Sequence, residues 1–109
     1  HIHCFSGSLS FCENVLSVWK NAFFGVTGRI LYNIPKYSDH VKDIVRCVPI
    51  ERILAETDSP FLSPPQFKQK FSTPALIPSI IKEIAKVKGI EEEYAFKQIR
   101  ENCHFVYGV

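Results

Sequence analysis

Two histidines and one aspartate have the types and the spacing to hold a metal ion. His1 and His3 are two residues apart, so on a strand both imidazoles face the same side. Imidazole is the commonest protein ligand for transition metals. Asp58 ends an apolar run, where a carboxylate needs a partner because an unpaired buried charge is costly. Singly, a terminal histidine is more often solvated and such an aspartate is often a turn former. The metal hypothesis therefore depends on the strand ends meeting.

The residues around these candidate ligands are interpreted more conservatively. Glu56 is two residues before Asp58, so on a strand both side chains face the same side. Glu56 is expected to orient a metal ligand or to pair with a lysine or arginine, and not to catalyse. The proline-rich loop that follows interleaves Lys68 and Lys70 with Phe67 and Phe71. Basic side chains beside aromatic rings are typical of contacts to single-stranded nucleic acid. A solvated loop anchored by an aromatic ring has the same pattern and is commoner.

Short apolar runs alternate with helical patterns, which predicts a parallel α/β fold. Strands are expected at Ile2–Phe5, Ala22–Val26 and Ile53–Asp58. Helices are expected after a Ser10 cap with Phe11, Val15, Val18 and Trp19 on one face, from Ser38 to Pro49, from Thr73-Pro74 to Gly89, and from Glu91 to about Phe105. Either a small open sheet or part of a (β/α)8 barrel fits this order. A complete barrel takes roughly 250 residues, so this chain would be less than half of one.

Bulk composition places the chain among ordinary globular domains. Its 109 residues suit one domain, with 46% hydrophobic and 22% charged residues. No apolar run approaches the roughly 20 residues of a membrane span, so no membrane association is expected. A net charge of +2 neither favours nor excludes nucleic acid. The four cysteines form no C-x-x-C pair, which favours a reducing, intracellular setting in the cytoplasm or nucleus.

Four segments, in order along the chain, resemble motifs of TatD-type metal-dependent deoxyribonucleases. His3–Gly7 is similar to the family's H-C-F-[ST]-G segment, and Gly25–Gly28 to the small-residue end of its next strand. Leu54–Leu62 resembles its L-x-E-T-D-x-P-[YF]-L segment. The end of the chain, with Glu101-Asn102-Cys103 and Tyr107-Gly108, is similar to its closing E-N-x…[FY]-G. The resemblance spans nearly the whole chain.

The resemblance implies a TIM-like (β/α)8 metallo-hydrolase barrel, of which residues 1–109 are the C-terminal part, about strands six to eight with their helices. It gives His3 and Asp58 the role of metal ligands, and Asp58 also a catalytic role on the attacking water. His1 has no matching role. The implied cofactor is a divalent cation, Mg²⁺ first and Zn²⁺ or Mn²⁺ as alternatives, and the implied reaction is hydrolysis of phosphodiesters in DNA.

One departure and two rival functions accompany this hypothesis. The family's upstream ligands are not in this sequence, so the chain alone is expected to be inactive. Phe71–Pro74 stands where the family often has Arg-Asn before the proline, which puts one substrate contact in doubt. A metal-dependent amidohydrolase would use a similar barrel, although the E-T-D-S-P segment speaks against it. A split product that survives only as a binding module is the non-enzymatic alternative.

Overall fold

The computed structural model describes residues 1–109 and confirms a parallel α/β arrangement. Strands β1, Phe24–Val26, and β2, Ile53–Ala55, pair in parallel with Phe24 opposite Ile53. The chain start adds a third parallel segment, because Ile2 bridges to Phe24 on the other edge of β1. The predicted first strand is thus reduced to one bridge. Cys4 has a φ of 45°, and this left-handed turn ends the extended run.

The central strand is the most deeply buried element. All residues of β1 are buried, as the apolar run on both faces predicts for a strand covered on both sides. Ile53 and Leu54 of β2 are also buried, whereas Ala55 is partly accessible. The predicted third strand therefore ends earlier, and residues 56–58 lie beyond it as its extension toward the site. Glu56 still donates its backbone N–H to the Val26 carbonyl at 2.9 Å.

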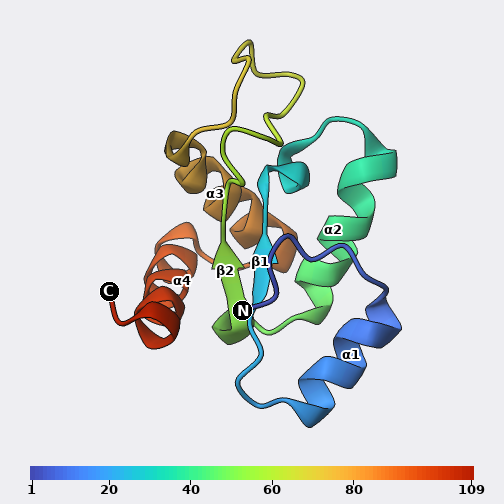
Figure 1. Ribbon diagram of the computed structural model, residues 1–109, viewed down its shortest axis with the longest axis vertical. Helices are drawn as coiled ribbons and strands as arrows, with labels where there is room; N and C mark the ends of the chain where they lie inside the picture. The colour runs from blue at the N-terminus through green and yellow to red at the C-terminus, as the bar shows by residue number, and fades with distance from the viewer.

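Four α-helices surround the strands: α1 Leu9–Val18, α2 Pro35–Cys47, α3 Ile77–Lys88 and α4 Glu92–Tyr107. In Figure 1, α3 lies behind the strands, α2 and α4 flank them, and no helix crosses in front. Short 3-10 turns span Gly28–Leu31, Ile50–Arg52 and Pro74–Leu76. The first of these lies between β1 and α2. No helix is long and apolar enough to cross a membrane.

Several predicted helix boundaries are wrong by a few residues. Ser8, and not Ser10, caps α1 by accepting from the Phe11 N–H at 3.2 Å. Ser38 lies buried inside α2, which begins at Pro35 because proline suits a first helical turn. Thr73 makes no side-chain cap, and α3 begins only after the Pro74–Leu76 turn. Gly89 does end α3, with a φ of 65° that glycine adopts without strain.

The apolar face predicted for the first helix is largely exposed. Phe11, Val18 and Trp19 are 52%, 72% and 68% accessible, and Cys12 is the one residue of α1 that is buried. The hydrophobic core instead joins β1 and β2 to α2 and α3 through Ile44, Ile80 and Ile84 among others. The fold therefore leaves a large apolar surface on α1 without a partner in this chain.

Asn102 fixes α4 to the strand that leads into the site. Asn102 is 4% exposed, and its side-chain amide donates to the carbonyls of Ile50 at 2.7 Å and Ile53 at 2.8 Å. These carbonyls belong to the turn before β2 and to its first residue. The residue that resembles the family's closing asparagine thus has a structural task, since it satisfies two buried acceptors at once.

Replacing Asn102 with leucine is expected to lower the free energy of unfolding by about 2–4 kcal/mol, because each buried carbonyl left without a hydrogen bond costs roughly 1–3 kcal/mol. Urea denaturation of the full-length protein, followed by circular dichroism, measures this loss. Glu101→Ala is the matched control, as Glu101 is the exposed neighbour on the same helix. Equal midpoints for the two variants would contradict the role assigned to the amide.

Candidate metal centre at the strand ends

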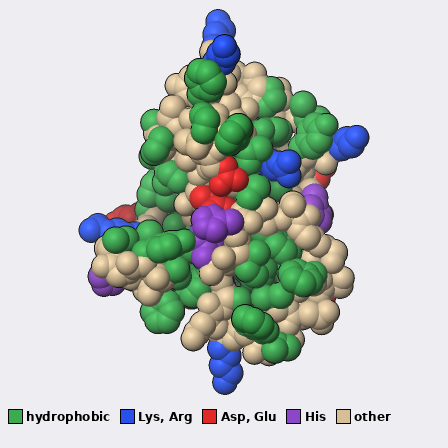
Figure 2. All heavy atoms as spheres, viewed as in Figure 1, with side chains coloured by type: hydrophobic (Ala, Val, Ile, Leu, Met, Phe, Trp, Pro, Cys, Tyr) green, Lys and Arg blue, Asp and Glu red, His purple; other side chains and the backbone are tan.

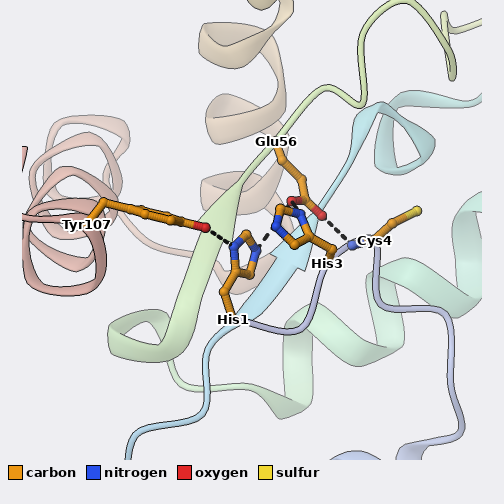
Figure 3. A network of polar contacts seen from close by, with 5 residues as sticks. All are labelled: His1, His3, Cys4, Glu56 and Tyr107. Atoms are coloured by element: carbon orange, nitrogen blue, oxygen red, sulfur yellow. Dashed lines mark hydrogen bonds and ion pairs between the residues drawn. The ribbon is translucent and has the colours of Figure 1, made fainter.

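The backbone of β1 brings together residues that are more than fifty positions apart. Gly25 donates its N–H to the Ile2 carbonyl at 2.8 Å, and Val26 accepts from the Glu56 N–H at 2.9 Å. The chain start and the end of β2 are therefore held on opposite edges of the same strand. As a result, His1 and His3 meet Glu56, as Figure 3 shows. Gly25 lies next to the Glu56 and His1 side chains.

Glu56 is the centre of a polar network. Its Oε2 lies 2.7 Å from His3 Nδ1 and 3.3 Å from His1 Nε2. Its Oε1 accepts from the backbone N–H of Cys4. The Glu56 side chain is 11% exposed and that of His1 9%, whereas that of His3 is 68% exposed. Both imidazoles therefore point their nitrogens at one shielded carboxylate oxygen, as the two-residue spacing predicts.

Tyr107 extends the network to the last helix. Its hydroxyl is hydrogen-bonded to His1 Nδ1, and the two rings pack edge to face with centroids 5.9 Å apart. The His1 and His3 rings lie 3.9 Å apart. His1 is thus fixed at both nitrogens, by Tyr107 on one side and Glu56 on the other. Figure 2 shows the histidine and acidic side chains adjacent in the middle of this face, with hydrophobic side chains around them.

The network occupies the space that a side chain at position 25 would fill. A Cβ built on Gly25 would overlap Glu56 Oε1 and lie 2.7 Å from His1 Nε2. Real Cβ atoms do not approach heavy atoms this closely. The glycine in the centre of β1 therefore permits the close approach of Glu56 and His1. No local sequence pattern predicts this contact.

Asp58 stands apart from this cluster. His1, His3 and Glu56 have ligand atoms that all lie within 4.8 Å of one another, and Asp58 is not among them. On a continuous strand, Asp58 would face the same side as Glu56. The strand ends at Ala55, however, and Asp58 has a left-handed φ of 50°, so its side chain does not join the cluster around Glu56. Asp58 instead neighbours Cys4, the residue after His3. Asp58 therefore lies at the same end of the strands as His3 and Glu56, although it is not part of their cluster.

The Cys4 thiol is influenced by burial and by two charged neighbours. Burial raises the pKa of the Cys4 thiol, and the neighbouring Asp58 carboxylate raises it further, while Arg29 acts in the opposite direction. The Asp58 side chain therefore lies beside the Cys4 thiol.

Comparison with known proteins decides the family. A sequence profile described as TatD related DNase matches residues 1–108. This chain belongs to the TatD family. The human 3'-5' RNA nuclease TATDN2 is 30% identical over 112 residues, and the match covers 100% of this chain but 14% of that protein. The 3'-5' ssDNA/RNA exonuclease TatD of Klebsiella pneumoniae is 29% identical, with 99% of this chain and 41% of that protein covered.

Solved structures place the TatD chain within a larger fold. The TatD homologue YJJV of Escherichia coli superposes with a TM-score of 0.84 at 23% identity, over 98% of this chain and 39% of that structure. The chain thus spans under half the length of the relatives it matches, and it is a fragment of the TatD TIM-barrel fold. Further relatives from Mycoplasma genitalium, Bacillus subtilis and Escherichia coli are named metal-dependent hydrolases.

A largely apolar groove opens beside the cluster in this TatD chain. It has a volume of about 900 Å³ and runs along β2, between α3 and α4. Its polar end is formed by His1, His3 and Glu56, and its walls include Leu54, Ile77, Ile81, Phe96 and Tyr107. The free edge of β2 borders it, since β2 pairs with β1 alone. Polar ligands and an unfilled apolar surface therefore share one end of the molecule.

The proline-rich loop, in which basic and aromatic residues alternate, has one anchored ring and one exposed ring. Phe67 packs against the core, while Phe71 is 56% exposed, with Lys70 Nζ 5.4 Å from its ring centre. The sequence therefore identified one exposed basic and aromatic pair. It missed the part played by Tyr107, whose only signal was the tyrosine of the closing motif. His1 was a candidate ligand by its spacing from His3, but the family resemblance gave it no role.

Proposed function

We propose that the full-length protein is a metal-dependent nuclease that hydrolyses phosphodiester bonds, and that this chain supplies strands six to eight of its barrel. DNA is the substrate proposed first. The proposal includes an intracellular location, in the cytoplasm or nucleus, supported by four cysteines that form no disulfide. Family membership and the fold of the solved relatives support the reaction class.

The contact that carries the proposal is between Glu56 and His3. Glu56 Oε2 accepts from His3 Nδ1 at 2.7 Å, and His3 Nε2 makes no hydrogen bond on its exposed side. Histidines that bind metal usually donate the other ring N–H to a carboxylate or a carbonyl, which fixes the tautomer and the ring orientation. Glu56 therefore prepares His3 Nε2 as a ligand, which is the orienting role predicted for Glu56.

Asp58 is proposed as the second ligand and as the catalytic carboxylate. It lies beside Cys4, the residue that follows His3 in the chain. A carboxylate there can hold a cation and accept a proton from the attacking water. Arg29 is proposed to pair with phosphate oxygens, a task for which a guanidinium is suited. The exposed Lys70 and Phe71 supply a contact for unpaired bases.

The donor set fits a divalent cation. One imidazole and one carboxylate suit Zn²⁺ or Mn²⁺ as well as Mg²⁺, with Mg²⁺ proposed first for phosphate chemistry. When bound, such an ion activates water and offsets the charge on the phosphate. His3, oriented by Glu56, and Asp58 would hold the ion from this chain, and the complete barrel would supply the other ligands.

Nuclease assays on the full-length protein test this proposal. We expect it to cleave end-labelled single-stranded DNA with Mg²⁺ present and to stop when a chelator is added. Matched RNA and double-stranded DNA oligonucleotides, assayed in parallel, define the substrate class. Turnover of cyclic amides or lactones without cleavage of any nucleic acid would favour the amidohydrolase alternative. Tight oligonucleotide binding without any turnover would favour a binding module.

A further inference from the structure

We propose that Cys12 and Cys47 form a redox-sensitive pair, which hydrogen peroxide oxidises to a disulfide that joins α1 to α2. The two residues are far apart in the sequence, one within α1 and the other at the last position of α2. Both thiols are free in this structure. The pair lies outside the cluster around Glu56, so the inference does not depend on metal binding or on nuclease activity.

Packing of α1 against α2 brings the two thiols together. The helices are in contact, Cys12 is a fully buried member of the hydrophobic core, and Cys47 packs against the same core. Burial raises the pKa of the Cys12 thiol to about 11, and the adjacent Cys47 adds to the rise. The two sulfur atoms are therefore neighbours. Such proximity is required, because cysteines whose Cα atoms are more than about 7 Å apart cannot be bridged without backbone movement.

The surroundings of Cys47 make it the thiol that reacts first with peroxide. Cys47 is partly exposed, whereas Cys12 is buried. The Lys88 ammonium group is held near Cys47, because its Nζ donates to the carbonyls of Val45 at 2.9 Å and Val48 at 2.7 Å. Partial exposure beside a fixed cation is typical of cysteines that oxidants attack.

The oxidation takes two steps. The Cys47 sulfur attacks one oxygen of hydrogen peroxide, the O–O bond breaks, and a sulfenic acid and water form. The Cys12 sulfur then attacks the Cys47 sulfur, the S–O bond breaks, and a second water leaves as the disulfide forms. The two thiols together lose two electrons and two protons, which the peroxide takes up. Cys12 thus acts as the resolving thiol.

The other two cysteines have different neighbours. Cys4 lies beside Asp58, and Cys103 lines the groove between α3 and α4. Among the cysteines, Cys47 alone affects the pKa of Cys12. The structure therefore favours one pairing over the alternatives.

Mass spectrometry of the folded full-length protein after peroxide treatment, with free thiols blocked and trypsin digestion under non-reducing conditions, tests the pair. We expect a species in which Cys12 is joined to the peptide Cys47–Arg52, and its loss when dithiothreitol is added. One tryptic peptide contains both Cys4 and Cys12, so fragmentation of the linked species assigns the sulfur. Cys47→Ser should abolish the link, whereas the matched control Cys103→Ser should retain it.

The melting temperature shows whether the link forms in the native fold. A disulfide constrains the unfolded chain, so the oxidised wild type should melt about 5 °C or more above the reduced protein. Cys47→Ser should show no such rise, and circular dichroism establishes that it is folded. Oxidation of Cys47 to sulfinic or sulfonic acid without the link, or a link from Cys47 to a different cysteine, would overturn the inference. A melting temperature that is no higher after oxidation would also overturn it.

Discussion

Asp58→Asn in the full-length protein is expected to abolish nucleic acid hydrolysis while leaving the fold intact. Asparagine keeps the shape of the side chain but removes the charge that binds the cation and accepts the proton of the attacking water. A carboxylate in that position is worth several kcal/mol, and each roughly 1.4 kcal/mol is a tenfold change in rate, so a loss of at least about 1,000-fold is expected. Single-turnover cleavage of labelled DNA at saturating Mg²⁺ measures the change.

Asp39→Asn provides the control, because Asp39 is an exposed aspartate on α2 and far along the chain from the strand ends. It should cleave at the wild-type rate. The melting temperature of Asp58→Asn should match that of the wild type, since Asp58 belongs to no ion pair of the structure. Normal turnover by Asp58→Asn at saturating metal would remove this residue from the active site.

Residues 1–109 expressed alone are expected to associate or to form a loosely packed state. The outer edge of β2 has unpaired backbone groups, which invite pairing with another chain. The groove of about 900 Å³ beside it has mostly apolar walls. The exposed Phe11, Val18 and Trp19 of α1 add to this apolar surface. Burial of these surfaces in dimers or aggregates removes them from water.

Analytical ultracentrifugation of the isolated chain and of the full-length protein, at matched concentrations, checks this expectation. The full-length protein serves as the control because the rest of the barrel would cover the groove and the strand edge. Binding of a hydrophobic dye by the isolated chain alone would agree with exposed apolar surface. A monomer that melts in one sharp two-state transition would contradict the prediction.

The order of strands and helices could be predicted from the sequence because it rests on apolar periodicity, which is a local property. The ends of the elements could not. Ser10 and Ser38 were expected to be caps, but each lies within a helix, because any serine near a helix start fits a capping pattern. The exposed face of α1 had the pattern of a core helix, since periodicity identifies an apolar stripe but not what covers it.

The candidate site was predictable to the extent that strand alternation governs it. His1 and His3 share a face as their spacing requires, and Glu56 contacts both. Asp58 lies beyond the end of β2 with a left-handed backbone, which no alternation rule anticipates. The Tyr107 contact joins the two ends of the chain, and a pairing over 106 residues leaves no local signal.

Gly25 offers a way to sort related chains by one letter. Any side chain at this position would occupy the space held by the Glu56 carboxylate and the His1 ring. A relative with a larger residue there must therefore hold the corresponding glutamate and histidine side chains in other positions, however well its other motifs agree. Conversely, a histidine at position 1 together with glycine at position 25 and glutamate at position 56 defines the subset of sequences in which this arrangement is sterically permitted. Membership of that subset can be read from sequence without a structure of each protein.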